Sequence, residues 1–232
     1  MYKIEDNYKF SNAFGDIDYQ IDTIETIIAE FLTDGLKLVE EKQNKMDQMF
    51  DKIDKIDPEE AAIFDQHVYE PERIKNIHLK NTFLSTGLSY IFSQFEYYLK
   101  EICLRSMDLF DSKVSLDSYK NKCRKKRISL NRPKNYLIDT YKINLIDKEK
   151  EWGKIENFYR IRNYFVHSNG NLINDPKIDQ FIKDEPNISL LGGEIILTNE
   201  FILEYSSILL SYMRIVMDRL YELRKSNQKN KK

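Results

Sequence analysis

Two long stretches of the sequence contain neither glycine nor proline, and they limit the fold more than any other feature. They run from Leu88 to Arg132 and from Glu194 to Lys232. A β-rich fold would need such residues at its turns, whereas the chain of 232 residues holds only 7 Gly and 5 Pro. Its hydrophobic content of 41% is enough to build a core. The sequence therefore predicts an all-α protein with long helices.

Apolar residues recur at helical spacing along most of the chain. They predict one long helix over residues 17–56, with a break near Gly35. A shorter helix is expected to begin at Pro58 and to end before Pro71. Further helices are expected over residues 72–110, 135–144, 148–168 and 199–224.

Glycine and asparagine mark the ends of the later elements. Gly170 is placed to end the helix over residues 148–168, and Asn199 is placed to cap the last helix. Gly192 and Gly193 separate two short β-prone runs, which is the strongest hairpin signal in the chain. The expected fold is a helical bundle with one short β-hairpin before the C-terminal helix.

Charge divides the chain into unequal parts. The first 72 residues hold 7 basic and 19 acidic residues, whereas residues 73–232 hold 29 basic and 19 acidic residues. We interpret residues 1–72 as an acidic helical extension, residues 73–225 as the main helical domain and residues 226–232 as a flexible basic tail. The basic part can attract a polyanion, and the acidic part can shield it or contact another protein.

Composition also limits the compartment and the chemistry. No segment is apolar enough to cross a membrane, and the acidic N-terminus lacks the apolar core of a signal peptide. We expect a cytoplasmic protein in which Cys103 and Cys123 are reduced thiols. No cluster of residues has metal-ligand spacing, and His67 and His78 stand alone on charged segments. The sequence therefore predicts no metal site and no cofactor.

The helix expected over residues 148–168 carries polar residues among apolar stripes. Arg160, Asn163 and His167 lie three and four residues apart, so their side chains form a polar strip. Arg162 is offset from His167 by more than a third of a turn, so one helix does not bring the two face to face. On spacing alone a structural role is favoured, because a histidine near a helix C-terminus is stabilised by the macrodipole and an arginine can extend from an apolar stripe.

The string Arg162-Asn163-Tyr164-Phe165-Val166-His167 resembles the R-N-x-x-x-H signature of HEPN domains, the higher eukaryotes and prokaryotes nucleotide-binding family. Its surroundings are similar too, since a glycine, a short hairpin and a terminal helix follow the motif. The segment from Tyr90 to Ile102 is similar to the family's first core helix, with Glu96 at its commonly acidic position. The resemblance covers roughly Arg73 to Leu223.

Many HEPN proteins are dimeric ribonucleases that act as toxins or anti-phage effectors, with motif residues of both subunits lining one cleft. The resemblance implies that this chain is a metal-independent endoribonuclease and a homodimer of the HEPN type. Arg162, Asn163 and His167 would be its catalytic residues, with Glu96 and Arg160 in support. RNA would be the substrate, and an antitoxin or sensor protein is a candidate partner for the acidic N-terminal helices.

A basic segment over residues 120–134 holds eight basic residues and no acid. We expect RNA phosphates to be contacted by Lys122, Arg124, Lys125, Lys126 and Arg127. A solvated loop is an equally good interpretation of this segment. One toxin branch of the HEPN family has a modifiable tyrosine two residues after the histidine. Asn169 stands there in this chain, which puts that form of regulation in doubt.

Two alternatives stay open at this point. In the first, the chain is a non-catalytic HEPN module that binds nucleotide, RNA or a protein and uses Arg162 and His167 only as ligand contacts. In the second, the acidic extension is the functional part and pairs with another chain. Deleting residues 1–57 and testing the remainder for dimerisation and RNA cleavage would separate the second from the others.

Overall fold

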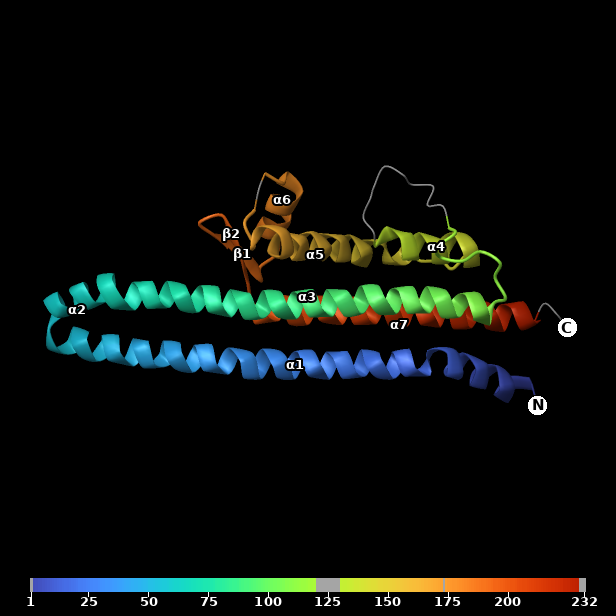
Figure 1. The fold of residues 1–232 in the computed structure, drawn as a ribbon, viewed down its shortest axis with the longest axis horizontal. Helices are drawn as coiled ribbons and strands as arrows, with labels where there is room; N and C mark the ends of the chain where they lie inside the picture. The colour runs from blue at the N-terminus through green and yellow to red at the C-terminus, as the bar shows by residue number, and fades with distance from the viewer. Residues whose placement is uncertain (1, 120–129, 173, 230–232) are drawn as a thin grey trace. The chain divides into compact units, whose positions relative to one another are not determined.

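The computed structural model describes residues 2–119, 130–172 and 174–229, and most of them are helical (Figure 1). The all-α prediction is therefore confirmed. The helices are α1 (Tyr2–Ile56), α2 (Pro58–Phe64), α3 (Glu70–Leu109), α4 (Asn131–Tyr141), α5 (Glu149–Ser168), α6 (Pro176–Asp184) and α7 (Asn199–Lys229), with a π-helical turn at Asp65–Tyr69 and a 3₁₀ turn at Ile146–Lys148. The predicted hairpin is formed by the antiparallel strands β1 (Ile188–Leu191) and β2 (Glu194–Leu197). None of the described helices combines the length and apolar character needed to cross a membrane.

The chain separates into two compact units, and the boundaries between them fall within α1, α3, α5 and α7. The first unit contains Met1–Glu25, Ile91–Tyr159 and Tyr205–Lys232. The second unit contains Thr26–Tyr90 and Arg160–Glu204. The Arg162–His167 motif and the β-hairpin therefore belong to the second unit.

Aromatic side chains fill the core of the first unit. The rings of Phe158 on α5 and Tyr205 on α7 stack with their centroids 4.9 Å apart and their planes 8° from parallel.

An ion pair attaches α1 to α3 in this unit, because the Arg105 guanidinium binds the Asp16 carboxylate. The pKa of Asp16 is lowered by this hydrogen bond. At least one acidic residue of α1 is therefore paired with a basic residue of the same chain.

In the second unit, α1 and α3 approach closely at two glycines. A Cβ atom on Gly35 of α1 would lie 3.2 Å from the ring of Phe83 on α3, and a Cβ atom on Gly87 of α3 would lie 3.5 Å from the ring of Phe31 on α1. The ring centroids of Phe31 and Phe83 lie 6.3 Å apart. Each helix therefore presents a phenylalanine to a glycine of the other.

Several local expectations differ from the structure. α1 begins at Tyr2 rather than at residue 17, and α4 spans Asn131–Tyr141 rather than residues 135–144. α1 continues through Gly35 without a break, since the glycine makes room for Phe83 while staying helical. Pro71 does not follow a helix end, because helical residues run without interruption from Pro58 to Leu109 and the π-helical turn at Asp65–Tyr69 lies just before Pro71. Thr198 caps α7, because its Oγ1 accepts a hydrogen bond from the backbone N–H of Phe201 at 3.2 Å, so the prediction that Asn199 is the cap was wrong.

Candidate functional site

The C-terminal half of α5 carries the motif on a helix with one buried side. Ile161 is fully buried, and it anchors this part of the helix in the second unit. Arg162 and Asn163 are half-buried, whereas Val166 and His167 are exposed. The motif thus runs from the protein interior to the surface within two turns.

The Arg162 guanidinium is hydrogen-bonded to the side chain of the next residue, Asn163. Its Nη1 donates a hydrogen bond to Asn163 Oδ1 at 3.1 Å. Its Nε lies buried and has no hydrogen-bond partner in the part of the chain that the structure describes. A buried guanidinium donor without a partner is costly, and each such group in a folded protein needs an explanation, such as an ordered water, an ion or a functional role.

His167 lies one turn beyond Asn163, at the C-terminal end of α5. No hydrogen bond or ion pair between Arg162 and His167 is found among the described residues. The reason is geometric, because five residues on an α-helix turn through about 140° beyond a full rotation. The expectation that one helix does not bring these two groups together agrees with this arrangement.

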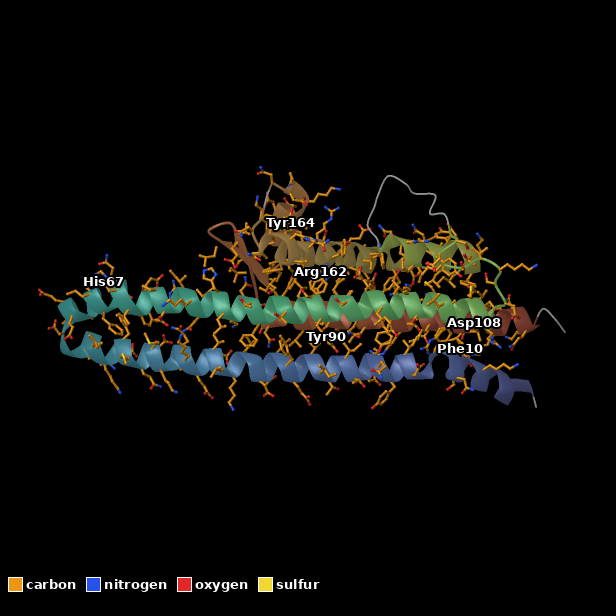
Figure 2. The ribbon with its side chains drawn as sticks, viewed as in Figure 1. Phe10, His67, Tyr90, Asp108, Arg162 and Tyr164 are labelled. Atoms are coloured by element: carbon orange, nitrogen blue, oxygen red, sulfur yellow. The ribbon has the colours of Figure 1, made fainter. Side chains whose placement is uncertain are left out.

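Arg160 and Tyr164 lie on another side of α5 and share one partner. Arg160 Nη1 lies 3.5 Å from Asp175 Oδ2, and the Tyr164 hydroxyl donates to the same oxygen at 3.4 Å. Figure 2 shows Tyr164 on the side of α5 that faces α6 and Arg162 on the opposite side. Burial and the Asp175 carboxylate raise the pKa of Tyr164. Arg160 is therefore committed to α6 in this structure and is separate from the Arg162 side chain.

Asp175 is the residue of this region that the sequence interpretation missed. Its Oδ1 caps α6 by accepting hydrogen bonds from the backbone N–H groups of Lys177 at 3.1 Å and Ile178 at 3.4 Å. The signal was present, since an aspartate followed by Pro176 is typical of a helix start. One carboxylate thus joins the motif helix to α6.

The chain after α5 leaves through two left-handed residues and joins the hairpin. Asn169 has φ 49° and Gly170 has φ 81°. The backbone N–H of Gly170 donates to Tyr164 O at 3.0 Å, and its carbonyl accepts from the N–H of Ile195 at 2.9 Å. Gly170 follows the helix end as predicted. The hydrogen bond from Ile195 of β2 to its carbonyl attaches this end of α5 to the hairpin.

The remaining predicted residues lie elsewhere. Glu96 is on α3 in the first unit, where it lines a cavity of about 220 Å³ with Leu99, Lys100 and Arg132. The five basic residues expected to contact RNA, Lys122, Arg124, Lys125, Lys126 and Arg127, lie outside the described residues. Across the described ranges, no group of three or more histidines, cysteines and carboxylates is placed to hold a metal ion.

Comparison with known proteins adds no family to this description. No family model matches the chain, no curated protein is similar to it, and no solved structure matches its fold.

Proposed function

We propose that this chain is a metal-independent endoribonuclease that acts as a homodimer through Arg162, Asn163 and His167. The observation that carries the proposal is the Arg162 side chain, whose buried Nε has no partner among the described residues while Asn163 holds its Nη1. A planar guanidinium fits the two oxygens of a phosphate. The resemblance of this segment to the HEPN signature points to the same chemistry.

His167 would move the protons. A base removes the proton of the ribose 2′-OH while that oxygen attacks phosphorus, and an acid protonates the 5′ oxygen as the P–O5′ bond breaks. The products are a 2′,3′-cyclic phosphate and a 5′-hydroxyl. Two copies of His167, one neutral and one protonated, would serve as base and acid, and each such role is typically worth about 10²–10⁴-fold in rate.

A second copy of the chain is part of the proposal because of the geometry of α5. Arg162 and His167 of one helix diverge by about 140°, so one copy does not bring the two side chains face to face, and a second motif helix would bring them to the same phosphate more easily. His167 and Val166 are exposed and free to approach a second motif helix. Arg162 would stabilise the charge on the phosphorane, and Asn163 would orient the guanidinium.

The test uses purified wild-type protein with Arg162→Ala, Asn163→Ala and His167→Ala, incubated with mixed RNA in excess EDTA. His67→Ala is the matched control, because His67 is exposed like His167 but lies outside the motif. We expect cleavage by the wild type and the control, with 2′,3′-cyclic phosphate ends and no cleavage of DNA, which lacks the 2′-OH.

Loss of cleavage in the Arg162, Asn163 and His167 variants, with the His67 control still active, would support the proposal. Equal activity in all proteins would reject these residues as the site. No cleavage by any protein, together with salt-dependent RNA binding that Arg162→Ala weakens, would instead identify a binding module.

A further inference from the structure

The edge of β2 that faces away from β1 is occupied by two different partners. At one end, Leu172 N donates to Gly193 O at 3.0 Å and Ile195 N donates to Gly170 O at 2.9 Å. This end is therefore bound by the segment that leaves the motif helix α5.

At the other end, the same edge is bound by a side chain of α3. Asn81 Nδ2 donates to Ile195 O at 2.8 Å, and Asn81 Oδ1 accepts from Leu197 N at 3.0 Å. The amide thus replaces one peptide group of a neighbouring strand. Asn81 is only 3% exposed, so its hydrogen bonds form in an environment where unpaired polar groups are costly.

A second contact strengthens this attachment. The Glu194 carboxylate accepts from Asn81 Nδ2 at 3.1 Å through Oε1, and its Oε2 lies 3.1 Å from His78 Nδ1. His78 and Asn81 are three residues apart and lie on one side of α3. Strand β2 is therefore fixed to α3 by both its backbone and its first side chain.

We infer that Asn81 is a positioning residue for His167, acting through β2 and Gly170. His167 lies three residues before Gly170, whose carbonyl is bound by Ile195 N, and Ile195 O is bound by Asn81. One residue of β2 thus links α3 to the end of the motif helix within the second unit. The catalytic consequence of this inference rests on the proposed function, whereas the mechanical link does not.

The experiment compares Asn81→Ala and Asn81→Asp with Asn76→Ala in the full-length protein. Asn81→Asp keeps the volume and the acceptor for Leu197 N but removes the donor to Ile195 O and to Glu194 Oε1. Asn76 is the matched control, because it is also a buried α3 asparagine at 4% exposure but donates to Gln43 of α1 at 2.9 Å. Amide hydrogen exchange and the NMR signals of the His167 imidazole are measured in each variant.

In both Asn81 variants we expect exchange over residues 168–172 and 193–197 to accelerate by about tenfold, and the His167 signals to shift or broaden. Asn76→Ala should leave both unchanged while loosening α1 against α3. Unchanged exchange and His167 signals in a folded Asn81→Asp protein would overturn the inference.

RNA cleavage then separates this inference from the proposed function. If the wild type cleaves RNA, we expect kcat to fall in the Asn81 variants at nearly constant KM, and an unchanged kcat would overturn the positioning role while leaving the function intact. If the wild type cleaves no RNA, the proposed function fails, and the exchange and imidazole signals alone decide whether Asn81 positions His167.

Discussion

The ring of Phe165 closes over Gly170, so that a Cβ atom on Gly170 would lie 2.8 Å from Phe165 Cε1. Gly170 also has φ 81°, a conformation that side-chain-bearing residues rarely adopt. Both facts demand glycine at this position. Gly170, which the sequence predicts as a helix end, therefore also packs against Phe165 at the end of the motif helix.

Replacing Gly170 should destabilise the protein. We expect Gly170→Ala to lower the free energy of unfolding by about 1–3 kcal/mol, because the variant combines backbone strain with the clash against Phe165. Urea denaturation followed by circular dichroism measures the change. Wild-type stability in this variant would mean that the loop after α5 relaxes freely.

Gly153, near the start of the same helix, is the opposite case. A Cβ atom there would meet no heavy atom within 4 Å, and the residue is helical. We expect Gly153→Ala to raise the free energy of unfolding by about 0.5–1 kcal/mol, since alanine favours a helix interior over glycine. The same denaturation series measures it, and a loss of stability would show that the space around Gly153 is needed.

Asp175 gives a prediction that separates capping from charge. Asp175→Ala removes the cap of α6 and the partner of Arg160, and we expect it to cost about 1–2 kcal/mol of stability. Asp175→Asn retains a side chain that caps helices and loses only the charge, so it should cost less than half as much. Thermal unfolding of both variants tests this order. Equal losses would mean that the ion pair with Arg160, and not the cap, is what Asp175 contributes.

Helix positions were predictable because they follow from local pattern. α3, α5 and the hairpin lie close to the predicted ranges, since apolar periodicity and paired glycines report on nearest neighbours in the chain. α6 was missed because nine residues with only Ile178 and Ile182 buried give a short signal. Its Asp175-Pro176 start was the clue available.

The partners of the site residues were not predictable from spacing. The polar strip on α5 was recognisable, yet the partner of Arg160 is Asp175, fifteen residues further along the chain. Asn81 lies three residues before the buried Leu84, so its place on the core side of α3 could have been inferred. Its partners on β2 are 114 and 116 residues away, and only the folded chain identifies them.

Glu72 provides a prediction on pH. Hydrogen bonds from Lys75 Nζ at 2.6 Å and Lys42 Nζ at 3.0 Å lower its pKa from 4.5 to about 2. Because the folded state favours the ionised carboxylate, this contribution to stability is present above pH 4.5 and is lost as the pH falls towards 2. An NMR titration of the Glu72 carboxyl group should show the lowered pKa. Lys75→Met should raise it most and Lys42→Met less, whereas Lys45→Met should leave it unchanged.

The reciprocal packing of α1 and α3 predicts a measurable coupling between Gly35 and Phe83. Alanine at Gly35 favours the helix by about 0.5–1 kcal/mol but places Cβ 3.2 Å from the Phe83 ring, so the gain should be largely offset by the crowding. In a Phe83→Leu background the ring is gone, and Gly35→Ala should recover its full gain. Unfolding free energies of the two single variants and the double variant form a double-mutant cycle, in which we expect a coupling of about 0.5 kcal/mol or more. Additive effects would mean that the Phe83 ring moves aside at no cost, and that the close approach does not fix the register of the two helices.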